Sequence, residues 1–303
     1  MKIGFSSLTA PQWDLQTLIS KAGEMGYDGL ELRGIKGQLE LTTIPELAGK
    51  PEYVREQLAE NKVELICLGS SVTFDTKNKK TLAEQKGILT EYIELAASLG
   101  CPNVRIYAGE IQPGFGPIPL DNLRALQARV AEALVEMAPV AAKHGVTILI
   151  ENGGDLADSA AMWFLVDATG YPSVQCCWNQ CLAVPASELP TTSIPRLGRK
   201  IGMVHICDAH FAENSGLLQG YCLPGEGETQ VDRQVELLKG LAYRGYLTFE
   251  WPRLWDSSLP EPDDVLPKVI SYLKEQLDAK QNILSAYKGD KNPTRFESLE
   301  SAS

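Results

Sequence analysis

The sequence predicts a single-domain (β/α)8 barrel, and three observations carry this prediction. Short runs rich in Val, Ile and Leu recur eight times along the 303 residues, and amphipathic helical stretches lie between them. Strands that alternate with helices pair in parallel through right-handed crossovers, and eight such units close into a barrel. The alternative is an open doubly wound sheet, whose dinucleotide-binding form lacks its signature here because no G-x-G-x-x-G follows the first strand.

Each predicted element follows from its local pattern. The strands are short apolar runs, as expected for a parallel sheet that is buried on both faces. The helices repeat apolar residues at i, i+3 and i+4, and two of them stop at a glycine. The strand candidates are Lys2–Ser7, Gly29–Arg33, Glu64–Gly69, Asn103–Ala108, Val146–Asn152, Val174–Asn179, Gly202–Cys207 and Leu247–Trp251, and the clearest helices are Leu15–Met25, Leu120–His144 and Asp263–Lys280.

The domain boundary is predicted near the end of the last helix. Residues 1–280 form the barrel, and residues 281–303 are a polar C-terminal tail with weak periodicity. The N-terminal segment lacks a hydrophobic signal core, and no apolar run approaches the ~18 residues that span a bilayer. Seven cysteines cannot all pair in disulfides. We therefore expect a cytoplasmic protein with reduced thiols.

Composition narrows the partners. The formal net charge of −11 argues against nucleic acid, whose phosphates need clustered Lys and Arg, and less strongly against an anionic membrane. A small molecule is the expected ligand. A homo-oligomer is compatible with the sequence, although no interface pattern specifies one.

The predicted strand ends carry the chemistry, because side chains at the carboxyl ends of barrel strands point into the active site. Four consecutive strands present polar residues there, two of them carboxylates and one an imidazole. Such ligands suit one divalent metal, Mn²⁺, Mg²⁺, Co²⁺ or Zn²⁺. Two carboxylates beside a metal can also move a proton on a carbon next to a carbonyl. The four residues are Glu151, Asn179, His205 and Glu250.

Several motifs in order resemble the xylose isomerase-like sugar phosphate isomerase/epimerase superfamily, over almost the whole predicted barrel. They are GYDGLELRG (26–34), KHGVTILIENG (143–153), CWN (177–179), HICDAH (205–210), LPGEGETQVD (223–232) and GYLTFEW (245–251). The resemblance implies a metal set at Glu151, Asn179, His205 and Glu250, with the two glutamates as the acid/base pair. The superfamily also contains endonuclease IV, which has a His-rich trinuclear zinc site. This sequence has only three histidines and cannot build such a site.

Departures from the family pattern fall on the same strands. Where the family pattern has a metal-ligating Asp, this sequence has Asn179. Leu182 replaces the substrate-contacting His three residues later, and Cys207 replaces a Lys of the family pattern. A neutral amide attracts a cation less than a carboxylate does, so we expect weakened metal binding or none. Cys181 or Cys207 would offer a soft ligand that favours Zn²⁺.

Three further residues are candidates for substrate binding. Arg105 either pairs with Glu31 as barrel scaffold or binds a substrate oxyanion, since a buried Arg needs a partner. His210 follows the seventh strand and would lie at the barrel mouth, and Trp251 could pack its ring on a sugar. The PGEG segment at 224–227 is either a lid or a tight turn.

Three functions are compatible with these residues. The first is a metal-dependent sugar or sugar-phosphate isomerase/epimerase that uses Glu151 and Glu250. The second is a lyase or dehydratase of the same superfamily, acting on a keto-sugar or keto-glycoside. The third is a non-catalytic carbohydrate-binding barrel with a degenerate metal site, which Asn179 and Leu182 suggest.

Overall fold

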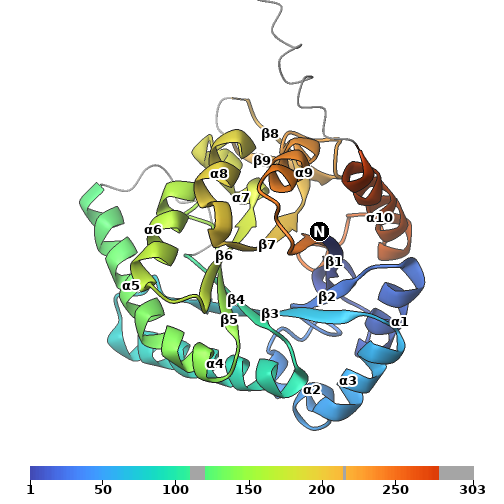
Figure 1. The fold of residues 1–303 in the computed structure, drawn as a ribbon, viewed down its shortest axis with the longest axis horizontal. Coiled ribbons are helices and arrows are strands. Elements are labelled where there is room, and N and C mark those ends of the chain that lie inside the picture. The colour runs from blue at the N-terminus through green and yellow to red at the C-terminus, as the bar shows by residue number, and fades with distance from the viewer. Residues whose placement is uncertain (110–119, 214–215, 280–303) are drawn as a thin grey trace, which may run out of the picture.

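The computed structural model describes residues 1–109, 120–213 and 216–279, and the predicted tail 281–303 lies outside them. Eight parallel strands close into a barrel in the order β1-β10-β7-β6-β5-β4-β3-β2, inside a ring of helices (Figure 1). The predicted (β/α)8 class is therefore confirmed. The barrel strands are β1 Lys2–Ser6, β2 Gly29–Leu32, β3 Glu64–Thr73, β4 Asn103–Tyr107, β5 Thr147–Glu151, β6 Val174–Asn179, β7 Ile201–Ile206 and β10 Tyr246–Phe249.

The helices cover the outer faces of the strands. All three helices predicted from the sequence are present within about two residues of their expected ends, as is usual for helix boundaries. Among the described residues, none of them combines the length and apolar character that crossing a membrane requires. The helices are α1 Leu15–Met25, α2 Pro45–Ala48, α3 Pro51–Glu60, α4 Lys79–Leu99, α5 Leu120–Lys143, α6 Ser159–Thr169, α7 Gln180–Ala183, α8 Pro190–Leu197, α9 Val231–Gly240 and α10 Pro262–Asp278.

Local signals explain where these helices begin and end. The side chain of Asp14 accepts a hydrogen bond from the backbone N–H of Thr17 at the start of α1, and Asp158 does the same for Ala161 in α6. Gly26 ends α1 with φ of 78°, a left-handed conformation that favours glycine. Caps of this kind satisfy backbone groups that the helix itself leaves unpaired.

Side chains fill the inside of the barrel in layers. The lower layer is apolar and contains Ile66, Cys67, Leu149, Cys177 and Met203. Above it lies a charged layer, because alternation along the strands places Glu31, Arg105, Glu151 and His205 on the same inward side. Gly69 makes room for this layer, since a Cβ there would lie 2.8 Å from Arg33 Cδ and 3.0 Å from Arg105 Nη2.

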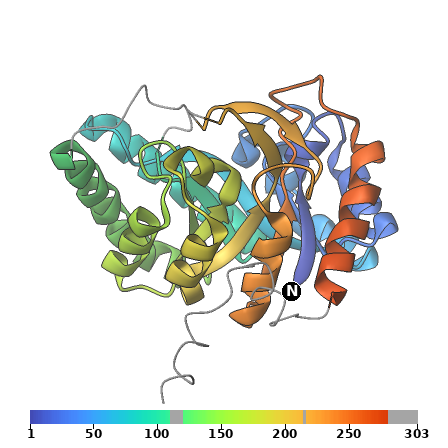
Figure 2. The same ribbon diagram turned by 90° about the horizontal axis from the view of Figure 1, so that it is seen from above.

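A two-stranded antiparallel hairpin lies outside the barrel order, and the sequence patterns did not predict it. It consists of β8 Asp208–Phe211 and β9 Leu218–Cys222. Figure 2 shows the hairpin at the end of the barrel opposite the N-terminus, where the strands have their carboxyl ends. The hairpin therefore stands beside the barrel mouth.

Candidate active site

Four neighbouring strands bring the predicted residues to one place. Glu151 ends β5, Asn179 ends β6, His205 is the penultimate residue of β7, and Glu250 follows β10. Register pairs Asn179 with His205 across β6 and β7. The predicted convergence of the four side chains is observed.

The polar atoms of these side chains form a closed ring. Asn179 Nδ2 donates to Glu151 Oε1 at 3.1 Å and to Glu250 Oε2 at 3.0 Å. His205 Nδ1 lies 2.7 Å from Glu151 Oε1 and 3.7 Å from Glu250 Oε2. The edges of this ring are close to the ~3 Å that separates adjacent ligand atoms around an octahedral ion with bonds of about 2.1 Å.

The orientation of the Asn179 amide is fixed by the backbone next to it. Its Oδ1 accepts a hydrogen bond from the N–H of Cys181 at 3.1 Å, which caps the short helix α7. A flipped amide would set its NH₂ group against that N–H, so the donor–acceptor pattern assigns the nitrogen to the ring. In this arrangement Asn179 presents hydrogen-bond donors to both carboxylates, whereas a metal ligand would present its oxygen.

Glu31 supports the other side of the His205 ring. Its carboxylate is fully buried, and Oε2 lies 3.2 Å from His205 Nε2. A carboxylate on the far nitrogen is the usual partner of a metal-ligating histidine, because it leaves the near nitrogen for the metal. Here Nδ1 is the near nitrogen and faces both Glu151 and Glu250. The contact of Glu31 with His205 was not predicted from the sequence, which suggested Glu31 only as a partner for Arg105.

Arg105 is a buried scaffold residue. The side chain is 0 % exposed, its Nε lies 3.3 Å from Glu151 Oε2 and 3.9 Å from Glu31 Oε1, and its guanidinium covers the ring of Tyr107. Nη1 donates to the carbonyl of Ser70. The alternative in which Arg105 pairs with Glu31 therefore describes the structure, and full burial argues against the predicted contact with substrate.

The two glutamates of the ring differ in their electrostatic environment. Burial alone would raise the pKa of Glu151, but the charges of His205 and Arg105 outweigh it and hold the pKa below its usual value. Burial raises the pKa of Glu250 to about 7, opposed by His205 and assisted by the negative charges of Glu151 and Glu31. The side chain of Glu250 is 15 % exposed and that of Glu151 only 1 %.

His205 and Glu31 are shifted in complementary directions. Burial lowers the pKa of His205, but Cys177, Glu151 and Glu31 together raise it well above its usual value. Burial raises the pKa of Glu31, and the charges of His205 and Arg105 reverse this and bring it to about 2. Both shifts have the same cause, because the imidazole and the guanidinium of Arg105 face the two buried carboxylates of Glu31 and Glu151.

Two predicted substrate residues lie elsewhere. Trp251 is 1 % exposed, stacks on Phe249 with ring centroids 5.8 Å apart, and donates from Nε1 to the carbonyl of Pro260. A ring packed in this way has no free face for a sugar. His210 is exposed on the hairpin and contacts Glu228 at 3.4 Å, not the ring of four residues. The packing of Trp251 therefore argues against its predicted contact with a sugar, whereas the contact of His210 with substrate stays a prediction.

Asp208 is a residue of this region whose role sequence reasoning missed. Fully buried at the start of the hairpin, it accepts hydrogen bonds from the N–H groups of Gly225, Gly227 and Thr229. A Cβ on Gly227 would lie 2.4 Å from Asp208 Oδ1. The PGEG segment is therefore a tight turn wrapped around one carboxylate, which favours that alternative over a lid. The HICD motif was the available signal.

Three donors of the ring fit a divalent metal. Glu151, His205 and Glu250 would supply two oxygens and one nitrogen, and catalytic metal sites commonly use three protein ligands. Glu151 Oε2 lies 3.3 Å from Arg105 Nε and His205 Nε2 lies 3.2 Å from Glu31 Oε2. These ion pairs occupy the far atoms, so Glu151 Oε1 and His205 Nδ1 are the donors that face Glu250.

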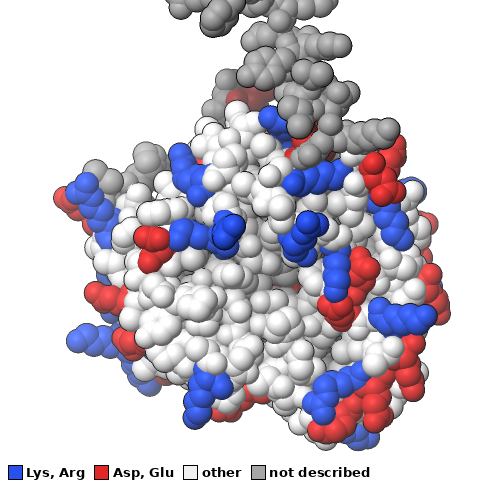
Figure 3. Space-filling model, viewed as in Figure 1, with Lys and Arg blue, Asp and Glu red and all other residues white. Residues whose placement is uncertain are grey.

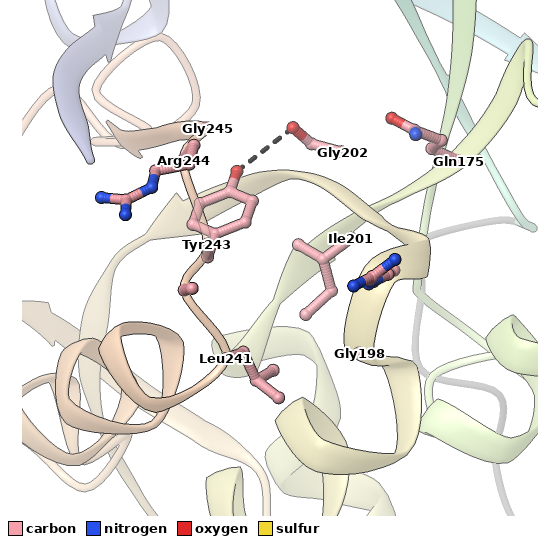
Figure 4. Close-up of a pocket in the computed structure, with 10 residues that line it drawn as sticks. Gln175, Gly198, Ile201, Gly202, Leu241, Tyr243, Arg244 and Gly245 are labelled. Carbon is pink, nitrogen blue, oxygen red and sulfur yellow. Dashed lines mark hydrogen bonds between the residues drawn. The ribbon is translucent and has the colours of Figure 1, made fainter.

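A separate cavity of about 520 Å³ lies at the opposite end of the barrel (Figure 4). It is bordered by the amino-terminal ends of β6 and β7 and by the loop before β10, where Tyr243 donates to the carbonyl of Gly202 at 3.1 Å. Residues at this end of a barrel serve stability more than catalysis. Figure 3 shows that the acidic and basic side chains of the face seen in Figure 1 lie mainly around its periphery, and that a broad area at its centre and lower left carries none of them.

Comparison with known proteins identifies relatives of the fold. The family model of the xylose isomerase-like TIM barrel matches residues 19–276. D-psicose 3-epimerase, solved in the presence of D-fructose, is 15% identical with a TM-score of 0.74, over 92% of this chain and 100% of that one. The IolI protein, solved with a bound zinc atom, is 17% identical with a TM-score of 0.75, over 91% and 98%.

A third solved structure is a probable 3-DHS dehydratase from Bacillus anthracis. It is 16% identical with a TM-score of 0.70, over 90% of this chain and 99% of that one. No curated protein matches the sequence. At these identities the solved structures establish a shared fold.

Proposed function

The chain belongs to the xylose isomerase-like TIM barrel family, and on that premise we propose that it is a sugar isomerase or epimerase that moves a proton on a carbon next to a carbonyl. The observation that carries the proposal is the ring of Glu151, Asn179, His205 and Glu250 at the barrel mouth. It sets two carboxylates on either side of one imidazole. The epimerase among the structural relatives supports the same reaction class.

The residues divide the work according to their surroundings. Glu250 is the more open carboxylate and would take the proton from the substrate carbon, whose electron pair passes into an enediolate. Glu151 would return a proton taken up from solvent, to the opposite face in an epimerase or to the neighbouring carbon in an isomerase, and Glu250 would release its proton to solvent. Asn179 holds both carboxylates through its two N–H groups, so it would keep them at a fixed separation while one proton is exchanged.

A divalent metal held by Glu151, His205 and Glu250, when bound, would supply the positive charge that stabilises the enediolate oxygens. Glu31 orients His205, and Arg105 balances the charge of Glu151 from below. The barrel interior beneath this charged layer is apolar, so it excludes water from the buried side of the site.

Deuterium exchange tests the proposal directly. We expect the purified protein, supplied separately with Mn²⁺, Mg²⁺, Co²⁺ or Zn²⁺, to incorporate solvent deuterium next to the carbonyl of at least one ketose. NMR of the same sample should show the epimer or isomer. Failure of exchange with every metal, across free and phosphorylated ketoses and keto-glycosides, would refute it.

A lyase that begins with the same proton abstraction is the second candidate. The dehydratase among the structural relatives favours it, and so does Tyr221, whose phenol packs beside Cys181 and Cys207 at the mouth and could donate a proton to a leaving group. The mass of the product distinguishes the two reactions. Loss of water or of an aglycone identifies the lyase, and an unchanged mass identifies the isomerase or epimerase.

A further inference from the structure

Cys177 belongs to the apolar lower layer of the barrel and adjoins the charged layer above it. It lies two residues before Asn179 on β6, so both side chains point into the barrel, and it is paired in register with Glu151. The ligand atoms of Glu151, Cys177 and His205 all lie within 4.8 Å of one another, and the three residues are buried. Cys177 thus approaches the pair of Glu151 and His205 from beneath, opposite the side that faces the mouth.

The neighbouring cysteines lie in other environments. Cys176 faces out of the barrel into the main hydrophobic core. Cys181 and Cys207 belong to a separate cluster under the hairpin, and the Cys207 thiol contacts Asn179 Oδ1 at 3.5 Å. The expected soft ligands, Cys181 and Cys207, are therefore not the ones that meet the imidazole and the carboxylate. Among the described cysteines, Cys177 alone does so.

Cys177 contacts polar groups as well as the apolar core. A free thiol among Ile66, Leu149 and Met203 is ordinary core packing. However, this thiol adjoins the carboxylate of Glu151 and the imidazole of His205, which are held by ion pairs with Arg105 at 3.3 Å and Glu31 at 3.2 Å. Thiolate, imidazole and carboxylate are the three ligand types of protein zinc sites.

The charge balance of the site favours Cys177 as a metal ligand. The amide of Asn179 is neutral and directs its nitrogen toward the carboxylates. A thiolate at Cys177 would restore the negative charge that this amide lacks, and the thiol proton would leave to solvent as the cation binds. Sulfur ligands shift preference from Mg²⁺ and Mn²⁺ toward Zn²⁺ and related soft ions.

We infer that Cys177, with Glu151 and His205, binds the metal of this site, and that the metal is thiophilic, zinc or cobalt rather than magnesium or manganese. This inference rests on the proposed function only in assigning that site a metal. In this ligand set Cys177 takes the place that Glu250 has in the metal set of the proposed function, and Glu250 stays beside the trio on the open side as the base.

X-ray absorption at the zinc edge of the intact protein tests the ligand without any substitution. We expect a sulfur neighbour at about 2.3 Å beside nitrogen and oxygen neighbours at about 2.0–2.2 Å. A shell of nitrogen and oxygen alone, or failure of the metal-free protein to bind zinc, overturns the inference.

Cobalt spectroscopy then assigns the sulfur. We expect wild-type protein loaded with Co²⁺ to show a sulfur-to-cobalt charge-transfer band in the near ultraviolet. Cys177→Ser should abolish the band and lower the preference for Zn²⁺ over Mn²⁺ by about tenfold or more. The matched control is Cys176→Ser, the adjacent buried cysteine on the opposite face of β6, which should keep both. A band that survives in Cys177→Ser overturns the inference.

The two proposals fail separately. Deuterium exchange without a sulfur ligand leaves the proposed function standing and removes the inference. A sulfur ligand without exchange on any substrate does the reverse.

Discussion

Each of the two sides of the barrel mouth carries a glutamate, and the two carboxylates differ in burial and in pKa. On the β5 side, Glu151 is 1 % exposed and is contacted by Asn179, His205 and Arg105. On the β10 side, Glu250 is 15 % exposed, and its nearest cation is His205 at 3.7 Å. The pKa of Glu151 is held below its usual value, whereas that of Glu250 is about 7. The difference shows how one barrel can assign the acid and the base of a proton transfer to identical side chains.

The largest effect is expected when the open carboxylate loses its proton chemistry. Glu250→Gln should lower deuterium exchange by about 10³–10⁴-fold, because the amide can accept Asn179's hydrogen bond but cannot take a proton. Rates measured by NMR check this. Glu226→Gln, an exposed glutamate in the turn after β9, is the control and should keep full activity. Equal rates in wild type and Glu250→Gln would show that Glu250 is not the base.

A substitution on the buried side of the site should mainly lower the stability of the folded protein. Glu31→Gln leaves Arg105 and His205 with one fewer buried anion, and removing one partner of a buried ion pair costs about 3–4 kcal/mol. Denaturant unfolding measures the loss. Glu64→Gln, an exposed glutamate of β3, provides a control expected to change stability by about 1 kcal/mol or less. Equal losses in both variants would contradict the assigned role of Glu31.

Because the pKa of Glu250 is raised, the substitution Glu250→Gln, which should lower activity, should increase the stability of the folded protein at high pH. The folded-state pKa of Glu250, about 7, exceeds the usual 4.5, so the fold favours the neutral form. That contribution is fully present below pH 4.5 and is lost as the pH rises through 7. Glu250→Gln should therefore be more stable than wild type at pH 8, by roughly 3 kcal/mol at most, and equal to it at pH 4.

Unfolding of the metal-free proteins at these two pH values checks this prediction. Glu226→Gln should show no such pH-dependent gain. A gain for Glu250→Gln that is the same at pH 4 and pH 8 would mean that the ionisation of Glu250 is not responsible.

A smaller effect should sharpen the role of the amide between the two sides. Asn179→Asp would put a third carboxylate beside Glu151 and Glu250, and we expect it to tighten divalent metal binding by about tenfold, or ~1.4 kcal/mol. Calorimetric titration with Mn²⁺ and Zn²⁺ measures it. Binding by the variant where wild type shows none would instead favour the non-catalytic barrel, and unchanged binding would count against Asn179 as the weak point of the site.

Much of the fold followed from local pattern. Each of the eight predicted barrel strands is present, because a strand buried on both faces must be a short apolar run whatever its neighbours are. The hairpin of β8 and β9 was missed for the converse reason. It is half exposed, and its position depends on the hydrogen bonds that Asp208 makes to residues 17 to 21 positions later.

The sequence by itself determined which residues meet at the mouth. Parallel strands end at one rim, so residues at the ends of β5, β6, β7 and β10 converge without further information. Period-two alternation likewise placed Cys176 and Cys177 on opposite faces. These are consequences of backbone geometry, which the residue pattern reports directly.

Only the tertiary structure decided what those residues do to one another. The amide of Asn179 is oriented by the N–H of Cys181, His205 is set between Glu31 and Glu151, and Arg105 is sealed beneath them. Each of these depends on distances across the barrel, between strands far apart in sequence. Within the stretch SVQCCWNQCLAV (173–184), Cys177 and Asn179 are therefore the residues that matter for the site, because side chains from other strands of the barrel contact them.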